Sequence, residues 1–418
     1  MSAGTDTAIA GPALETRPAA RSPLRTPHFR NLWLGSTVSY IGDQFYLVAL
    51  PWLVLELTGS GLAVGSMLMV AAVPRAVLML MGGAVTDRSA PRNILLATTW
   101  ARTVLVGIVT LLAWLHWVQL WHLYVLSALF GTADAFAIPA GQALLPTLVE
   151  REQLTSANAL FSGAIQASTL LGPAPAGIAI GAWGIATAFL VDTVSFVFAI
   201  VPLTLLPKGD RQTGQPAHRA SMWGSIAHGV GYVWNDAALR SLVLIIAGLN
   251  LWAIGPITVG MPVLAKFKFA SSTAFGTMVS AFGAGALAGM MLAGIFRPTR
   301  RRGYLFLSFV FIESAGIVAM PFCDQLWLLA VLMVLIGICG GIANVSMMAW
   351  IQGRVDHLLM GRVMSVIMFA AVGLMPVSLA LAGLVAERHA TAMFTVAGVL
   401  MMLTALVAGL SPATRHID

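Results

Sequence analysis

Long apolar segments separated by short polar breaks follow one another along nearly the whole chain of 418 residues. Apolar residues make up 58% of the sequence and charged residues only 9%, whereas a soluble protein carries about 25% charged residues. This number of charged residues is too small to cover a water-facing surface. Most of the exterior must therefore be solvated by lipid. The apolar runs are too long for barrel strands and lack their period of two. The sequence therefore predicts an all-α integral membrane protein.

Each apolar segment is long enough for one membrane crossing, which needs about 20 residues. Twelve transmembrane helices are predicted, at residues 31–57, 61–85, 93–113, 120–142, 154–180, 183–206, 241–265, 272–296, 303–322, 325–350, 361–386 and 390–411. The spans at 325–350 and 361–386 have the least distinct limits.

The basic residues orient these spans, because cytoplasmic segments are enriched in Lys and Arg. If both termini are cytoplasmic, the outer loops hold only three of the 23 basic residues, namely Lys266, Lys268 and Arg388. Two more, Arg75 and Arg102, lie inside spans, and the other eighteen lie in cytoplasmic segments. We therefore expect a protein of the cytoplasmic (inner) membrane with both termini in the cytoplasm. The net charge of +7 is then a topology signal, and it predicts membrane lipids and no nucleic acid as partners.

The chain also divides into two similar halves. Its only long polar interruption, 207–222, leaves six spans on each side, and apolar residues at helical spacing follow it. Pro51, Gly65 and Gly83 recur 211 residues later as Pro262, Gly276 and Gly294, which indicates a duplication. The expected parts are a flexible cytoplasmic tail at 1–27, a six-helix bundle at 28–206, a cytoplasmic linker with an amphipathic helix at 207–240, a second six-helix bundle at 241–411, and a short tail at 412–418.

The loop between the second and third spans has the pattern Gly-x-x-x-Asp-Arg-x-x-x-Arg, formed by Gly83, Asp87, Arg88 and Arg92. With this loop, residues 28–411 resemble the major facilitator superfamily. Further segments resemble its drug, macrolide and siderophore exporters, namely Gly42-Asp43, Pro51, Leu57-Thr58-Gly59-Ser60, Gly131, Pro139-Ala140 and Gly361-Arg362-Val363-Met364-Ser365. The loop departs from the usual family pattern at Ala90 and Pro91.

The resemblance implies the major facilitator fold, in which two six-helix bundles related by a parallel repeat rock about a central cavity. It implies a monomeric secondary transporter that exports an amphiphilic small molecule, a drug-like compound or siderophore, by proton antiport with alternating access. Two alternatives stay open: a lysolipid or lipid translocator, and a membrane sensor or assembly partner that transports nothing. We find no enzyme motif, and we expect no cofactor and no metal site.

Ionisable residues inside spans cost several kcal/mol unless they are paired or wetted, so each is a candidate functional residue. Asp43, Arg75, Arg102 and Asp134 all lie about 12–18 Å from the cytoplasmic end of their predicted spans, at 1.5 Å per residue. We expect a nearly neutral cluster, in which Arg75 and Arg102 form a buried ion-pair network with the acids. The sequence does not decide which arginine pairs with which aspartate.

The acids also suit proton coupling, because a carboxylate that loses its arginine partner takes up a proton more readily. Asp43 and Tyr46 share one helix face, and the resemblance places spans 1, 4, 7 and 10 around the cavity. Asp43, Tyr46, Asp134, Asn250 and Asn344 are therefore the candidate proton-coupling and cargo residues, with helix-to-helix hydrogen bonds as the alternative role of the two asparagines. Asp192 and Glu313, on spans that are peripheral in this fold, are interpreted as structural.

The charged loop is a candidate cytoplasmic gate. Its members are Gly83, Asp87, Arg88 and Arg92, and the resemblance supplies Gly361 and Arg362 as partners at the start of span eleven. A helix amino terminus attracts an anion, so Asp87 is expected to lie near Gly361 when the gate is closed.

Overall fold

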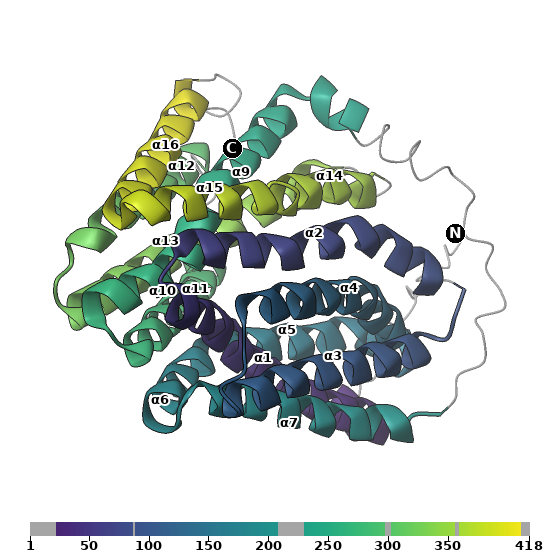
Figure 1. The fold of residues 1–418 in the computed structure, drawn as a ribbon. Coiled ribbons are helices and arrows are strands. Elements are labelled where there is room, and N and C mark those ends of the chain that lie inside the picture. The colour runs from purple at the N-terminus through teal and green to yellow at the C-terminus, as the bar shows by residue number, and fades with distance from the viewer. Residues whose placement is uncertain (1–21, 87, 208–229, 297–301, 356–358, 411–418) are drawn as a thin grey trace, which may run out of the picture.

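The computed structural model describes residues 22–86, 88–207, 230–296, 302–355 and 359–410, and every regular element in these ranges is helical. The first half of the chain contains α1 (Pro27–Thr58), α2 (Gly61–Thr86), α3 (Pro91–Trp114), α4 (Leu120–Leu144), α5 (Leu154–Leu171), α6 (Pro173–Trp183) and α7 (Ile185–Leu205). The second half contains α9 (Ala237–Gly255), α10 (Met261–Leu264), α11 (Ser272–Phe296), α12 (Arg302–Ala319), α13 (Leu326–Arg354), α14 (Met360–Val372), α15 (Met375–Arg388) and α16 (Ala390–Leu410). Figure 1 shows the two sets lying side by side.

The described residues contain eleven helices long and apolar enough to cross a membrane. They match eleven of the predicted spans, and the twelfth, 154–180, is divided into α5 and α6 at Gly172. Pro173 begins α6 and has no N–H to donate to the preceding turn, so the helix is interrupted there. The prediction of an all-helical membrane protein is thus confirmed, and twelve crossings are consistent with the structure.

Another predicted span, 361–386, is also two helices. α14 ends at Val372, and α15 begins at Met375 with a proline in its first turn. The seventh span is longer than predicted, because α9 continues through the π-helical turn Pro256–Gly260, through α10 and through a second such turn, Ala265–Phe269. Of the predicted amphipathic helix at 222–240, residues 222–229 lie outside the described residues, and 230–235 are helical.

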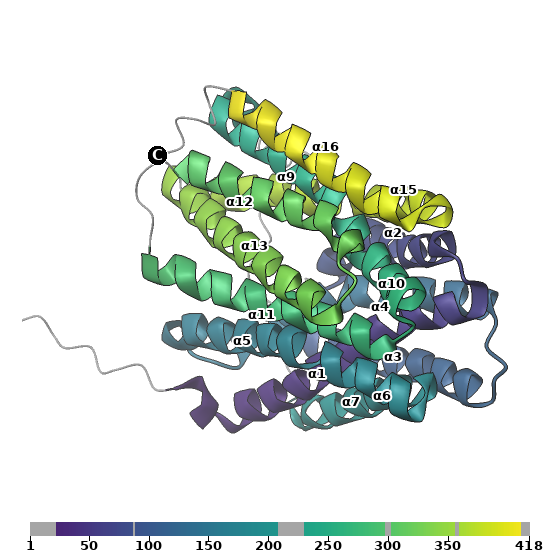
Figure 2. The ribbon, with the colours of Figure 1, turned by 90° about the vertical axis from the view of Figure 1, so that its left-hand side faces the viewer.

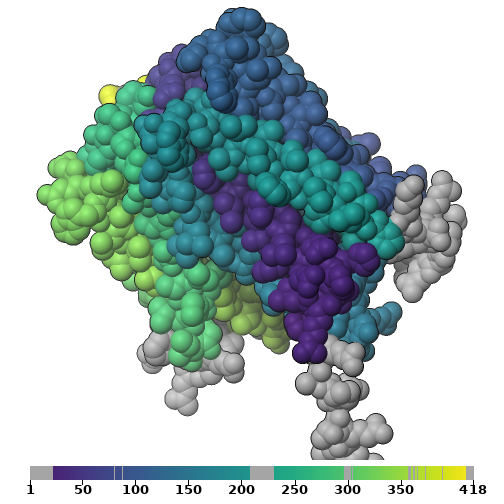
Figure 3. Space-filling view, turned by 90° about the horizontal axis from the view of Figure 1, so that it is seen from below, coloured from purple at the N-terminus to yellow at the C-terminus, as the bar shows by residue number. Residues whose placement is uncertain are grey.

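The helices pack mainly within their own half of the chain. In the first half, α1 and α3 both contact α7, and α4 contacts α2 and α3. In the second half, α13 contacts α11 and α12, and α16 contacts α12 and α9. Side chains on the outside of these helices are apolar and exposed. Figure 3 shows α1 and α7 along one such face, where Phe198, Val201 and Leu205 of α7 are exposed and suited to lipid contact.

The halves meet mainly through two helix pairings, α2 with α15 and α11 with the divided span of α5 and α6 (Figures 1 and 2). A repeated glycine permits close approach in each pair. A Cβ on Gly65 of α2 would lie 2.5 Å from the carbonyl oxygen of Leu379, and one on Gly276 of α11 would lie 2.2 Å from that of Pro173. These two glycines are 211 residues apart, so the repeat seen in the sequence corresponds to a structural repeat at the interface.

The contacts between the halves favour one end of the molecule, the end at which α1 meets α2, which we call the α1–α2 end. The carboxylate of Glu387, at the end of α15, accepts hydrogen bonds from the Ser60 hydroxyl (2.5 Å) and the Leu62 amide (3.3 Å) at the start of α2. Toward the opposite end, the α2–α3 end, α14 packs on α9 of its own half.

Candidate functional site

The predicted charge cluster lies inside the first half, and its best-defined contact joins α3 to α4. Nη1 of Arg102 lies 3.3 Å from Oδ1 of Asp134, and the two side chains are 15% and 17% exposed. The guanidinium also lies over the ring of Phe196 on α7, 4.8 Å from its centroid. A guanidinium between a carboxylate and an aromatic ring neutralises the acid and gains a cation–π contact.

Asp43, on α1, belongs to the same cluster. Its side chain is half-buried and lies within electrostatic reach of Arg102 and Asp134. The three helices α1, α3 and α4 thus bring together three of the four residues that the sequence placed at one depth.

The fourth residue, Arg75 on α2, points to the other half of the molecule. Its Nη2 lies 3.9 Å from the sulfur of Met375, at the start of α15, and Asp134 is within its electrostatic reach. Arg75 therefore lies at the boundary between the halves, beside the break between α14 and α15. Our sequence interpretation placed it within the first bundle alone.

Tyr46 is enclosed by aromatic side chains of the first half. Its ring stacks on Phe130 of α4, with centroids 4.7 Å apart, and meets the edge of Phe189 of α7 at 6.0 Å. Only 9% of the residue is exposed. Tyr46 thus belongs to the apolar surroundings of the charged cluster. Such surroundings have a low dielectric constant, which strengthens the attraction between Arg102 and Asp134.

Asp192, which we interpreted as a structural residue, lies in the charged cluster as well. It is fully buried on α7, one helical turn before Phe196, and it lies within electrostatic reach of Asp43, Arg102 and Asp134. The sequence contained a signal for this position: Asp192 is 14 residues from residue 206, the end of its predicted span, which corresponds to about 21 Å of helix. That depth is within one or two turns of the other acids.

The candidate residues of the second half are separate from the cluster. Nδ2 of Asn250, on α9, donates to the carbonyl of Ile246 in its own helix at 2.9 Å. Asn344, on α13, is exposed. Glu313, on α12, lies near Gly340 of α13, where a Cβ on the glycine would be 3.9 Å from Oε1. Among the candidate residues that the structure describes, the charged cluster is therefore confined to the first half.

The predicted gate is only partly described. Asp87 lies outside the described residues, and for Gly361 and Arg362, at the start of α14, only the backbone is described. Arg88 is exposed. Arg92 binds the carboxyl end of α7, because its Nε donates to Leu203 O at 2.9 Å and its Nη2 to Thr204 O at 2.8 Å. The last carbonyls of a helix lack intrahelical partners, so Arg92 caps α7 and fixes the charged loop to it.

Sequence reasoning missed a group of polar contacts between the halves at the α1–α2 end, made by Glu387 and Lys266 of the second half, which we call the latch. Besides the Glu387 contacts, Lys266 lies 4.0 Å from Glu56 and 4.9 Å from the ring centroid of Trp52, and Trp52 donates to Glu56 at 2.8 Å. Lys266 belongs to the second half and the other two to the first. No sequence signal pairs residues that are so far apart in the chain.

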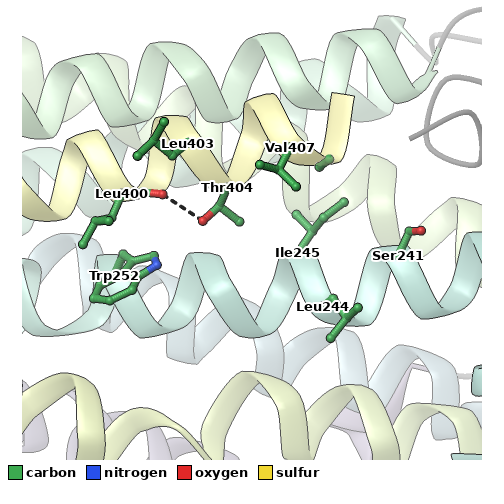
Figure 4. Close-up of a pocket in the computed structure, with 9 residues that line it drawn as sticks. Ser241, Leu244, Ile245, Trp252, Leu400, Leu403, Thr404 and Val407 are labelled. Atoms are coloured by element: carbon green, nitrogen blue, oxygen red, sulfur yellow. Dashed lines mark hydrogen bonds between the residues drawn. The ribbon is translucent and has the colours of Figure 1, made fainter. Parts of the chain in front are cut away.

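A cavity of about 410 Å³ lies apart from the charged cluster, between α9 and α16. Figure 4 shows Ile245 of α9 and Thr404 of α16 pointing into the space between the two helices, with Trp252 of α9 and Leu400 of α16 beside them. The Thr404 hydroxyl donates to Leu400 O at 2.8 Å, so it is satisfied within its own helix. The cavity is therefore an apolar groove on the second half, and it holds no charged side chain.

Known proteins similar to this chain are transporters. The family model described as transmembrane secretion effector matches residues 18–418. The chain belongs to this family of the major facilitator superfamily. It is 27% identical to the multidrug efflux pump Tap of Mycolicibacterium fortuitum, over 95% of this chain and 98% of the relative. It is 24% identical to macrolide efflux protein A of Streptococcus pyogenes, over 93% and 97%.

Solved structures show the same fold. A bacterial homologue of the iron transporter ferroportin, in an inward-facing state, superposes with a TM-score of 0.68 at 16% identity, over 92% of this chain and 99% of that one. The predicted fold is thereby confirmed, and the family match confirms the predicted superfamily.

Proposed function

We propose that this protein exports an amphiphilic, drug-like molecule across the cytoplasmic membrane by proton antiport, with both termini in the cytoplasm. The observation that carries the proposal is the half-buried pair of Arg102 and Asp134 with Asp43 beside it, inside a transporter of this superfamily. A carboxyl group that is held by an arginine, and is still partly exposed, can exchange a proton when the pair separates. The arginine stays charged throughout, because a guanidinium group is not deprotonated in proteins.

Two efflux pumps among its relatives, one for several drugs and one for macrolides, support export of a bulky and largely apolar cargo. The cargo would bind between the halves. In the state described, the latch of Glu387 and Lys266 joins the halves at the α1–α2 end, which is the outer end in the proposed orientation. Opening that end and closing the other would move the cargo outward.

The proposed outward movement of the cargo requires a segment that can adopt two packing arrangements. The break between α14 and α15 supplies such a segment. α15 stays packed on α2, while α14 packs on α9, so the two parts of this span can move separately. Arg75 contacts Met375 at this break, and its charge acts on Asp134. Loss of a proton at the acids can in this way change the contact between the halves.

The test is uptake of a radiolabelled macrolide into inside-out vesicles that contain the protein and are energised with an acidic interior. Accumulation above the level of vesicles treated with a protonophore is the expected result. Asp43→Asn and Asp134→Asn should each reduce accumulation at least tenfold, while exchange of macrolide down its own gradient persists. Full accumulation in both variants would place proton coupling elsewhere, and no accumulation in the unaltered protein would reject macrolide–proton antiport.

A further inference from the structure

Asp192 is a buried carboxyl group that too few hydrogen-bond donors contact. The side chain is 0% exposed, and its Oδ1 receives only a long contact of 3.4 Å from the Ser195 hydroxyl. Its Oδ2 has no hydrogen-bond partner within the part of the chain that the structure describes. Gly42 packs so closely that a Cβ there would lie 2.9 Å from Oδ1. An ionised carboxylate so enclosed costs several kcal/mol, so the group must gain a proton or a cation.

A complementary donor lies in the same cluster. Nη1 of Arg102 is directed to Asp134, but its Nε is buried and has no hydrogen-bond partner among the described residues. The guanidinium stands over Phe196, one turn from Asp192 on the same helix. Arg102 therefore lies between Asp134 of α4 and Asp192 of α7. Among the described residues, its Nε donor is unpaired, and so is the Oδ2 acceptor of Asp192.

The charges around Asp192 do not cancel. The helices packed on α7 are α1, α3 and α6, and α6 contains no ionisable residue. α1 contributes Asp43 and the phenol of Tyr46, and α3 contributes Arg102. With Asp134 of α4 and Arg75 of α2 the cluster has three carboxyl groups and two guanidinium groups. A single proton makes it neutral.

We infer that Asp192 is the third acid of the coupling centre and the alternative partner of Arg102. While Arg102 pairs with Asp134, Asp192 holds the proton of the cluster. When Asp134 takes up a proton from one side, Arg102 turns to Asp192, the O–H bond of Asp192 breaks, and its proton leaves toward the other side through Asp43. One proton enters and one leaves in each cycle. This inference rests on the proposed antiport, because the exchange has a use only if protons cross the membrane.

Infrared spectroscopy of the purified full-length protein in lipid nanodiscs tests the proton on Asp192 without any cargo. At neutral pH the spectrum should contain a carbonyl stretch of a protonated carboxyl group, and Asp192→Asn should remove it. Asn has the size of Asp and no charge, so this variant should also fold. Glu313→Gln is the matched control, a half-buried acid of the second half, and should leave the Asp192 band in place.

The infrared spectrum of Arg102→Gln gives a second test, in a protein that keeps Asp192. Without the guanidinium, more than one carboxyl of the cluster must be protonated, so the carboxyl signal at neutral pH should increase. An unchanged spectrum in both Asp192→Asn and Arg102→Gln overturns the inference.

Transport then tests the coupling role. Asp192→Asn mimics the protonated state, so it should keep macrolide exchange down a gradient and lose pH-driven accumulation at least tenfold. Full pH-driven accumulation in this variant overturns the role of Asp192 in coupling. If the unaltered protein accumulates no macrolide, the proposed function fails, while the infrared result still decides whether Asp192 holds a proton.

Discussion

The two halves of this protein have the same repeat and differ in where they hold charge. The first half surrounds Arg102 with three acids from three other helices, whereas the middle of the second half contains Glu313 alone among the described acids. The glycines that let the halves approach, Gly65 and Gly276, are repeated. A duplication therefore preserved the packing geometry of the interface, and the cluster of ionisable groups around Arg102 belongs to one copy only.

This difference suggests that the two halves have different roles in transport. Buried ion pairs add little net stability, because the cost of removing charges from water offsets their attraction. Their presence in one half fits the proposed proton exchange better than a role in stabilising the fold. The second half, with its apolar groove between α9 and α16, has the surface suited to apolar molecules.

The largest expected effect comes from breaking the pair between α3 and α4. Arg102→Ala should lower the free energy of unfolding by about 3–5 kcal/mol, because Asp134 is left as an unpaired buried charge. The measurements are folded yield and melting temperature in detergent. Adding Asp134→Ala should restore part of both.

Glu313→Gln is the matched control in the second half and should change the melting temperature little, because no charged partner is lost. A well-folded Arg102→Ala protein that only loses cargo binding would contradict this prediction and place Arg102 in the cargo site. An equal loss of stability in Glu313→Gln would remove the contrast between the halves.

A smaller effect should appear at the repeated glycines, and it should be similar in both halves. In Gly65→Ala and Gly276→Ala the new Cβ meets a backbone carbonyl at 2.5 and 2.2 Å, so the helix pairs must separate. Overpacking of this kind costs about 1–3 kcal/mol. Melting temperatures of the two variants give the comparison.

Gly163→Ala, in α5, is the control for the glycine variants, because a Cβ there meets no atom within 4 Å. It should stabilise its helix, since Ala exceeds Gly in helix propensity by about 1 kcal/mol. A loss of stability at Gly65 alone would mean that the repeat in the sequence has no counterpart in the packing.

Most of the fold could be predicted from the sequence, because lipid imposes one rule on every span. Each crossing must be about 20 apolar residues long, and Gly65 and Gly276 of the repeat each let a neighbouring helix approach closely. The breaks at Gly172 and Val372 were missed, although Pro173 marks the first. A proline can either kink a membrane helix or end it, and neighbouring helices decide which.

The site could be predicted only in outline. The common depth of Asp43, Arg102 and Asp134 indicated a cluster, since depth follows from counting residues. Depth does not give the direction in which a side chain faces, so Asp192 was assigned to the periphery and Arg75 to one bundle. The contact of Glu387 with Ser60 depends on the packing of α15 on α2, and pairing over such a separation cannot be read from one sequence.

The smallest expected effect lies at an ion pair outside the spans, where the second half holds charge in contact with water. Asp236 accepts bonds from the Ala238 and Leu239 amides at the start of α9 and from Nε of Arg354 at 3.0 Å. Partial burial alone would raise the pKa of Asp236, but these hydrogen bonds outweigh it and hold the pKa below its ordinary value of 3.8.

A lowered pKa in the folded state means that Asp236 contributes stability above its ordinary pKa and loses it as the pH falls through the lowered one. Because Arg354 is 45% exposed, the pair should add only about 0.2–1 kcal/mol. Asp236→Asn keeps a good helix cap and removes the charge, so its melting temperature should match that of the unaltered protein at low pH and fall slightly below it at pH 6. A difference at pH 6 as large as that for Arg102→Ala would show that exposed charge stabilises the second half as strongly as buried charge stabilises the first.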